Sequence, residues 1–450
     1  MADITIHCDE PIGRIKPLHG LNNGPVGYGS LVDVSAYYKQ LDVPCVRIHD
    51  PNWPHPREVD IPQIFPDFEA DPADPASYDF RRTDDYLQSI VDTGAQIVYR
   101  LGTSIEHTKR KYYVHPPKDF AKWADICIGV IRHYNQGWAD GFHHGIRYWE
   151  IWNEPDGAPN TPPERRAMWS GTSQQYFELY KTAATAIKRF DPSLKVGGFA
   201  ATMGNPDFTR RFMDYCATEK LPLDLFTWHT YTDQPAQLVA NALTVRSMLD
   251  ERGYTATESH CNEWNYAWWD SESTGVFGAH NEYATQRLFE RMRGVDGASF
   301  DAAVLIAAQD CPVDVMNFYD GAPTSYWSLF NWYGVPQKNY YAFKAFRELL
   351  NTPQRLQIER DVRAGCLYAL AGAGDSSRDT ALLVSNFDGE DREYELCFAG
   401  LPAERGVIET SVLDEGHNLD LIHAQEWQGK MAEARLFLGR HTVTLLKLKG

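Results

Sequence analysis

The sequence predicts an α/β protein in which an eight-stranded (β/α)8 TIM barrel is followed by a C-terminal antiparallel β-sandwich. Three observations lead to this prediction. Residues 14–345 alternate short apolar runs with amphipathic segments, eight such runs are present, and the helical periodicity fades after about residue 350. Apolar strands separated by helices indicate a parallel sheet, and eight such units close into a barrel of about 250 residues. A chain of 450 residues therefore has room for one barrel and one smaller unit.

Eight candidate barrel strands follow one another along the chain. They are "IKPLHG" (15–20), "CVRIHD" (45–50), "QIVYRLG" (96–102), "RYWEIWNEP" (147–155), "KVGGFA" (195–200), "DLFTWHTY" (224–231), "TESHCNEWN" (257–265) and an eighth within 303–320.

The segments between the strands have the period of helices. In residues 118–134, apolar side chains recur at steps of three and four, which places them on one helix face. Residues 173–192 repeat the pattern and end at Pro192, which helps to stop the helix. The alternative fold is an open doubly wound sheet, but no glycine-rich phosphate loop supports it, since "GYGS" at 27–30 is incomplete.

The last hundred residues have a different pattern. Segments such as "CLYALAG", "DTALLVSNF" and "HTVTLLKLK" are short, and turn signals such as "GAGDSS" and "DGED" separate them. This pattern predicts a β-sandwich over residues 350–450. The alternating segment "DITIHCD" precedes the barrel, so we expect residues 1–13 to add a strand to that sandwich.

Charge and composition exclude some classes of function. The formal net charge of −18 argues against a nucleic-acid-binding protein, and the basic run Lys109–Lys111 is too short to reverse this. The 8 cysteines show no zinc-binding spacing, and neither a signal peptide nor a membrane span is visible. We therefore expect reduced thiols, no metal, no cofactor, no membrane partner and a cytoplasmic protein, secreted only if a leader was removed.

Polar residues at the carboxyl ends of the barrel strands are the candidate functional residues, because that end of a barrel forms the active face. Glu154 lies near the carboxyl end of the fourth predicted strand, and Glu263 lies near that of the seventh. Two carboxyl groups that converge across a scissile bond are what glycoside hydrolysis requires, one of them protonated by an apolar setting and the other kept ionised by donors such as Arg47 and Tyr231. The further candidates are Asn153, His49, Asp50, His229 and the aromatic residues Trp264, Trp268 and Trp269, which could stack on sugar rings.

The motifs "EIWNEP" and "CNEWN", with "VRIHD" and "SYWSLFNWYGVPQKNYYAF", resemble those of glycoside hydrolase family 39. The resemblance covers about residues 14–345 and implies a retaining mechanism with Glu154 as general acid/base and Glu263 as nucleophile. It further implies that Asn153 binds the sugar 2-hydroxyl, that Tyr231 bonds the nucleophile, and that His49 and Asp50 line the subsite of the terminal sugar. The context "CNEWN" departs from the Thr-Glu context expected of the xylosidases, which leaves the sugar open.

The resemblance implies an exo-acting hydrolase in carbohydrate metabolism, a β-xylosidase or arabinosidase acting on pentose-containing plant glycans or oligosaccharides. A uronide-specific, iduronidase-like enzyme is an alternative that Lys109–Lys111 keep open, and a transglycosylase would use the same residues. A non-hydrolytic carbohydrate-binding barrel is a third alternative. A homo-oligomer is compatible with the sequence. We expect the sandwich to brace the barrel or to take part in an oligomer interface.

Overall fold

The computed structural model describes residues 2–27, 29–51, 57–106, 108–157, 160–267, 282–324, 327–361, 367–376 and 378–450. Its centre is a closed barrel of eight parallel strands. In chain order these strands are β2 (Gly20–Asn22), β5 (Cys45–Ile48), β6 (Gln96–Leu101), β7 (Tyr148–Ile151), β8 (Lys195–Ala201), β9 (Leu225–Thr232), β10 (Glu258–Tyr266) and β11 (Val315–Phe318). The predicted fold class is confirmed.

The first barrel strand lies later in the chain than the sequence pattern suggested. We expected it at residues 15–20, whereas β2 occupies Gly20–Asn22. Pro17 lacks the N–H that a strand buried in the barrel must donate, and residues 15–19 instead connect the barrel to the neighbouring sheet. The strand itself is short and fully buried.

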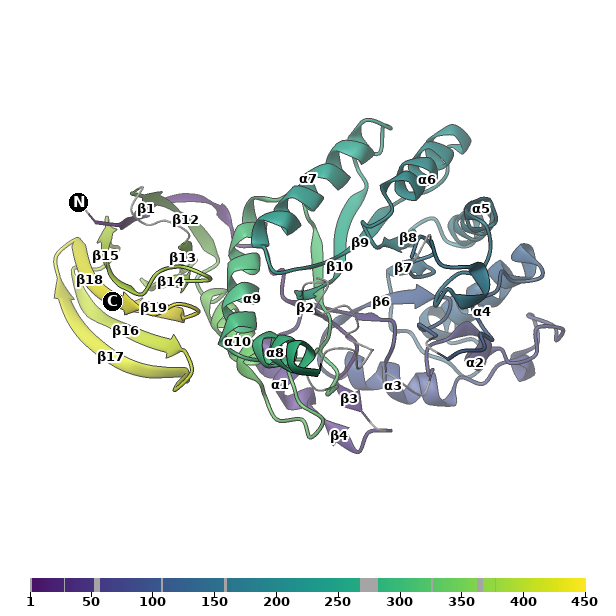
Figure 1. The fold of residues 1–450 in the computed structure, drawn as a ribbon, viewed down its shortest axis with the longest axis horizontal. Helices are drawn as coiled ribbons and strands as arrows, with labels where there is room; N and C mark the ends of the chain where they lie inside the picture. Colours follow the sequence, from purple (N-terminus) through teal and green to yellow (C-terminus); the bar gives the residue numbers. More distant parts are fainter. Residues whose placement is uncertain are drawn as a thin grey trace.

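Ten helices are described, and most of them lie around the barrel (Figure 1). They are α1 (Ser35–Leu41), α2 (Ile61–Ile64), α3 (Arg81–Val91), α4 (Phe120–Gln136), α5 (Ser173–Phe190), α6 (Pro206–Glu219), α7 (Pro235–Asp250), α8 (Glu282–Arg293), α9 (Val295–Ala307) and α10 (Lys338–Leu349). Among the described helices, none is both long and apolar enough to span a membrane.

Local sequence signals fix the ends of the two helices expected from periodicity. Asp119 caps α4 by accepting from the backbone N–H groups of Ala121 and Lys122, and Gly137 ends the helix in the left-handed conformation. Thr172 and Gln175 form a reciprocal capping box at the start of α5.

A second, nine-stranded sheet lies beside the barrel (Figure 1). It contains β1 (Ile4–Arg14), β12 (Gln354–Arg360), β13 (Tyr368–Ala373), β14 (Thr380–Ser385), β15 (Arg392–Ala399), β16 (Arg405–Leu413), β17 (Asn418–Gln428), β18 (Met431–Leu438) and β19 (Val443–Lys449). All pairings are antiparallel except that of β1 with β15. The sheet curls over its own apolar core, so that its edge strands β17 and β18 meet where the Gln425 amide donates to the Glu433 carbonyl, 2.9 Å away.

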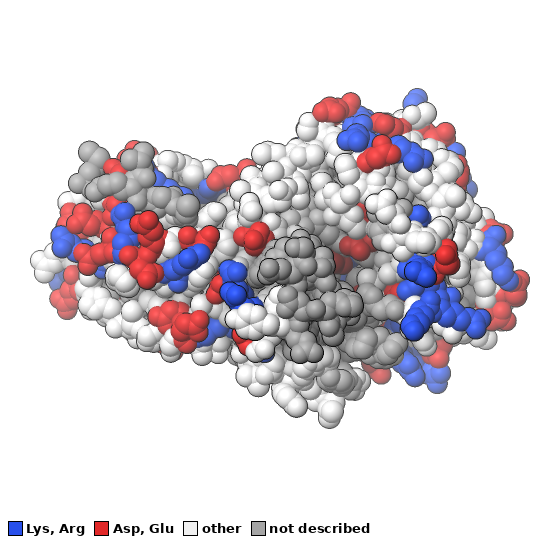
Figure 2. Space-filling view, viewed as in Figure 1, with Lys and Arg blue, Asp and Glu red and all other residues white. Residues whose placement is uncertain are grey.

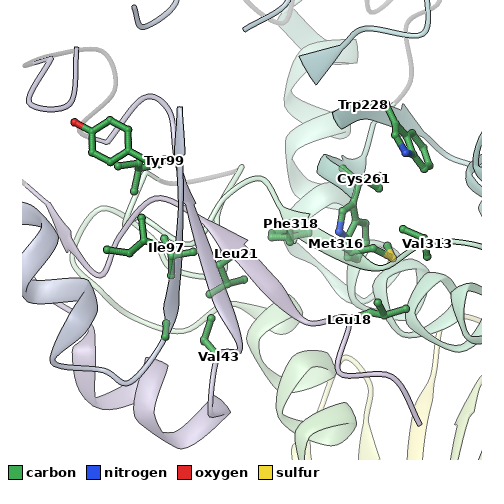
Figure 3. Packing of buried hydrophobic residues seen from close by; sticks show 14 of the residues in the cluster. Leu18, Leu21, Val43, Ile97, Tyr99, Trp228, Cys261, Val313, Met316 and Phe318 are labelled. Carbon is green, nitrogen blue, oxygen red and sulfur yellow. The ribbon is translucent and has the colours of Figure 1, made fainter. Parts of the chain in front are cut away.

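The barrel and the sheet share apolar packing. A continuous core extends from barrel residues such as Leu21, Met316 and Phe318 (Figure 3) to residues of the sheet such as Leu383 and Leu445. Helices α9 and α10 lie between the two and contact both. Charged side chains of both signs gather over the sheet and over the end of the barrel opposite the sheet (Figure 2).

The described cysteines are free thiols, and all of them except Cys397 are buried. Cys366 lies outside the described residues.

We expect Ile6→Ala to destabilise the protein by about 2–4 kcal/mol, because Ile6 is fully buried in the core of the nine-stranded sheet. Denaturant unfolding followed by tryptophan fluorescence measures this change. Ile12→Ala is the matched control, since Ile12 lies on the same strand β1 but is 51% exposed, and its effect should stay within about 0.5 kcal/mol. Equal effects of the two changes would show that β1 is not held in the sheet.

Candidate active site

The polar residues predicted from the strand ends converge at one end of the barrel. Arg47 lies on β5, Asn153 and Glu154 follow β7, His229 and Tyr231 lie on β9, and Glu263 lies on β10. These strands are parallel, so their carboxyl ends meet at one rim, where side chains far apart in sequence come into contact.

The backbone after β7 is shaped to present Glu154. Trp152 and Glu154 both have positive φ angles, 70° and 45°, which are uncommon for residues with a side chain. The Trp152 N–H donates to the Leu101 carbonyl on the β6 side, and the Glu154 N–H donates to the Phe199 carbonyl on the β8 side. Pairing on both sides holds this strained segment, and strain of this kind clusters at functional sites.

Arg47 is the fully buried cation around which the site is assembled. Its Nη1 donates to Glu263 Oε1 at 2.7 Å, and its Nη2 donates to Asn153 Oδ1 at 2.6 Å. Its Nε donates to Glu150 Oε2 at 2.8 Å. A planar guanidinium can serve three acceptors in fixed directions, so Arg47 sets the relative positions of three side chains from two other strands.

Glu263 is held as an acceptor by two donors. Besides Arg47, the Tyr231 hydroxyl donates to Glu263 Oε2 at 2.6 Å. Burial, followed by the negative charge of Glu263, raises the pKa of Tyr231 well above its ordinary value, so the phenol keeps its proton and remains a donor.

Glu154 has a different environment. Its side chain is 21% exposed, compared with 7% for Glu263, and its Oε1 lies 2.7 Å from His229 Nδ1. Burial raises the pKa of Glu154 to about 7, although Arg47 opposes the shift. One carboxyl oxygen of Glu154, one of Glu263 and a ring nitrogen of His229 all lie within 4.8 Å of one another.

His49 and Asp50 lie next to this group, as expected. Both are buried, and His49 contacts Arg100, which belongs to a buried ion pair. Arg100 Nε can only donate, so His49 Nδ1 accepts its hydrogen bond at 3.1 Å, and the ring is neutral with its proton on Nε2, 3.3 Å from Asp50 Oδ2. Burial lowers the pKa of His49 well below its ordinary value and raises that of Asp50 to about 7. Arg100 itself pairs with Asp60 at 2.7 Å.

Sequence reasoning missed several members of the site. Glu150 and Arg100 were visible only as charged residues inside apolar strands, and each proves to be fully buried in an ion pair. Asp320, which follows β11, is a further carboxyl group near Asp50 and Glu263. Burial raises the pKa of Asp320 well above its ordinary value, and the charges of Asp50 and Glu263 raise it further. Asn262, which directly precedes Glu263 in the sequence, was not predicted as a site residue and is fully buried.

The tryptophans predicted to contact a sugar are placed differently or fall outside the described residues. Trp264 is fully buried between the barrel and α10, with its ring stacked on Phe343 and edge-on to Phe318. These contacts direct the Trp264 ring toward α10 and away from the mouth where Glu263 lies. The expectation that it binds substrate is therefore wrong. Trp268 and Trp269 lie outside the described residues.

Among the described residues, the trio Glu154, His229 and Glu263 is the group whose donor atoms are close enough to hold a metal ion. Protein groups already account for these atoms, because Arg47 and Tyr231 engage Glu263 while His229 bonds Glu154. We interpret the trio as acid–base and nucleophilic groups.

A barrel with two carboxyl groups facing each other at its mouth defines the structural class to which retaining glycosidases belong. Within that class, residues 38–261 match the model of glycosyl hydrolases family 39, and this barrel segment belongs to that family. The match includes Glu154 and ends two residues before Glu263. The resemblance predicted from the motifs is confirmed.

Individual relatives extend the comparison. A β-xylosidase from Geobacillus stearothermophilus is 26% identical over 258 residues, which are 52% of this chain and 48% of the relative. A β-xylosidase from Caldicellulosiruptor saccharolyticus is 25% identical and covers 61% of this chain and 54% of its own length. The chain thus spans about half the length of the curated relatives it matches.

Two solved structures resemble the chain over its whole length. A glucosidase from Croceicoccus marinus has a TM-score of 0.82 at 26% identity and covers 100% of this chain and 99% of its own. A monomeric β-xylosidase from Caulobacter crescentus CB15 has a TM-score of 0.72 at 16% identity, with 99% of both chains covered, and supports the fold alone.

We expect Arg47→Met to destabilise the protein by about 3–5 kcal/mol, because it leaves the buried carboxylates Glu150 and Glu263 without their cation. Arg14→Met is the control, since Arg14 pairs with Asp375 at the exposed surface, where such pairs contribute about 0–1 kcal/mol. Chemical unfolding of the two variants beside the parent protein measures the difference. A loss at position 47 no larger than that at position 14 would contradict the central role of Arg47.

Proposed function

We propose that the protein is a retaining, exo-acting glycoside hydrolase that removes a terminal neutral sugar from an oligosaccharide or glycan. One observation carries this proposal, namely the approach of Glu154 and Glu263 to within 4.8 Å. Retaining enzymes place their two carboxyl groups about 5–5.5 Å apart, whereas inverting enzymes need about 6.5–9.5 Å to admit a water molecule.

The environments of the two carboxyl groups assign their roles. Glu263, held by Arg47 and Tyr231, is the nucleophile that attacks the anomeric carbon and forms a glycosyl ester. Glu154, with a pKa raised to about 7, gives its proton to the departing glycosidic oxygen. In the second step Glu154 takes a proton from water, and the hydroxide displaces the sugar from Glu263.

Asn153 is placed to bind the sugar. Its Oδ1 accepts from Arg47, which fixes the orientation of the amide and leaves the Nδ2 donor for a substrate hydroxyl. A bond from this donor to the sugar 2-hydroxyl would strengthen as the oxocarbenium-like transition state forms.

For the sugar we favour a pentose, β-D-xylose before L-arabinose, because the relatives of the barrel segment are named as β-xylosidases. Glucose is the second candidate, since a structural relative that matches the whole chain at 26% identity is named as a glucosidase. A uronide is disfavoured, because Asp50 and Asp320 adjoin Glu263 and the buried cations Arg47 and Arg100 are already engaged by carboxylates. In the basic run Lys109–Lys111, which kept the uronide alternative open, the Lys111 ammonium is likewise engaged, because it donates to the Glu106 carbonyl.

The first test is release of an aryl leaving group from a panel of aryl glycosides: β-D-xyloside, β-D-glucoside, α-L-arabinofuranoside, β-L-arabinopyranoside, β-D-galactoside and α-L-iduronide. We expect turnover of the xyloside or the glucoside and none of the iduronide, with Glu263→Gln silent throughout. Glu258→Gln is the matched control, because Glu258 lies at the opposite end of β10 in an ion pair with Lys195 and should leave turnover near that of the parent. Sugar binding on a glycan array without any turnover would favour the non-hydrolytic alternative.

The pH dependence provides a second test. Since Glu154 must be protonated to act as the acid and its pKa is raised to about 7, kcat/KM should fall as the pH rises above about 7. Glu154→Gln should lose on the order of 10²–10⁴-fold in kcat/KM with poor leaving groups, and it should lose this basic limb with an activated dinitrophenyl leaving group, which needs no acid. A basic limb that persists in Glu154→Gln would mean that another group is the acid.

A further inference from the structure

A chain of buried polar side chains connects the two carboxyl groups behind the substrate face. Glu150 lies at its centre. Glu150 Oε2 accepts from Arg47, and its Oε1 accepts from the Asn262 amide nitrogen at 2.5 Å. A carboxylate paired with arginine offers only acceptors, so Asn262 must turn its NH₂ group toward Glu150 and its Oδ1 the other way.

His229 interacts with the Asn262 side chain, whose NH₂ group is turned toward Glu150. Asn262 acts on the pKa of His229 as a side-chain hydrogen-bond partner that raises it. The ring Nε2 of His229 and the Oδ1 of Asn262 are both buried, and neither has a hydrogen-bond partner among the described residues. A buried polar atom left unsatisfied is costly, and these two interacting side chains can satisfy each other, with a small adjustment, only if Nε2 carries a proton.

The second ring nitrogen then has a defined role. Burial lowers the pKa of His229 to about 4, so the imidazole is neutral at pH 7 and has one N–H. With that proton on Nε2, Nδ1 is an acceptor, and it lies 2.7 Å from Glu154 Oε1 and 3.4 Å from Glu263 Oε2. At the shorter distance the hydrogen bond requires a proton on Glu154.

The charged neighbours of both groups agree with this arrangement. Arg47, Glu150, Glu263 and neutral His49 act on His229, and burial exceeds their effects. Arg47 acts on Glu154, whose carboxyl in turn raises the pKa values of Asp156 and Tyr231. The structure shows no donor to Glu154 Oε1 among these groups other than His229, so the tautomer of His229 decides whether the protonated or the ionised carboxyl is favoured.

We propose that Asn262, oriented by Glu150, holds His229 in its Nε2–H tautomer, so that His229 accepts a hydrogen bond from protonated Glu154 and keeps the general acid loaded. Asn262 and His229 are positioning residues, and the effect on catalysis that we infer for them rests on the proposed function. A bound glycosidic oxygen takes over from Nδ1 as acceptor of the Glu154 proton. The carboxylate left behind faces a lone pair on Nδ1, which favours its recovery of a proton from water in the second step.

The opposite tautomer predicts the opposite behaviour. A proton on Nδ1 would be donated to Glu154, would stabilise the ionised carboxylate, and would leave Nε2 as a buried lone pair. The two tautomers therefore differ in the sign of the effect of His229 on Glu154, which makes them distinguishable by experiment.

Nitrogen-15 NMR of the histidine-labelled full chain tests the tautomer without turnover, and the signal lost in His229→Gln identifies the residue. We expect a protonated-type shift at Nε2 and an unprotonated-type shift at Nδ1 in the parent protein at pH 7. A proton on Nδ1 would overturn the proposal. Since this readout needs no substrate, an inactive protein with the expected tautomer would count against the proposed function alone.

The pH profile tests the consequence. We expect Asn262→Ala to move the basic limb of kcat/KM down by about one pH unit, the size of shift that loss of one hydrogen bond to the protonated form produces. Asn262→Thr should restore the limb in part, because a hydroxyl can accept from Nε2 and donate to Glu150. A basic limb unchanged in Asn262→Ala would show that Asn262 is merely structural.

Asn317→Ala is the matched control for the loss of a buried asparagine. Asn317 lies on β11, where it donates to the Leu21 and Cys45 carbonyls away from His229. We expect this variant to be destabilised with its basic limb in place. An equal shift in both variants would overturn the proposal, because general loosening of the barrel would then explain it.

Discussion

The site depends on one buried cation. Carboxylates at the mouth of a barrel repel one another and lose hydration, so they cannot be gathered there without compensation. Arg47 provides it with a single guanidinium, which bonds Glu150, Asn153 and Glu263 in three fixed directions. The position of Glu263, the proposed nucleophile, and the orientation of the Asn153 amide are consequences of that one side chain, and so is the orientation of Asn262, which donates to Glu150. A lysine could not replace it, because a point charge does not impose three directions.

The two glutamates take different roles because their partners differ. They are neighbours in space, yet Glu263 accepts two short hydrogen bonds from groups that keep their protons, whereas the partner of Glu154 among the described residues is a neutral histidine. Burial raises the pKa of Glu154 more than the charge of Arg47 lowers it. The proposed roles of nucleophile and acid thus follow from the number of donors that each carboxyl group faces at the rim of the barrel.

Much of this arrangement followed from the sequence, and the rest depended on contacts that no pattern reveals. Alternation along strands and convergence at the barrel rim were enough to bring Arg47, Glu154, His229, Tyr231 and Glu263 together. Alternation does not decide the position of Trp264, because β10 is irregular between Cys261 and Glu263, and only its packing against Phe343 shows that it faces α10. The sequence did not predict Glu150 and Asn262 as site residues, because their roles depend on hydrogen-bond partners on other strands. The first barrel strand was misplaced because an apolar run beside a proline looks like a strand, although its backbone cannot complete the ladder.

The nine-stranded sheet supports the site through β10, the strand that carries the proposed nucleophile Glu263. Tyr266, three residues beyond Glu263 on β10, packs against Phe300 of α9 and Phe387 of the sheet, and those two rings also pack against each other. Helix α9 contacts β10 on one side and strands β13 and β14 on the other. A carboxylate that must stay within fractions of an ångström of its donors needs a strand supported from outside the barrel. The sheet supplies that support through shared apolar packing, which argues that it braces the catalytic barrel.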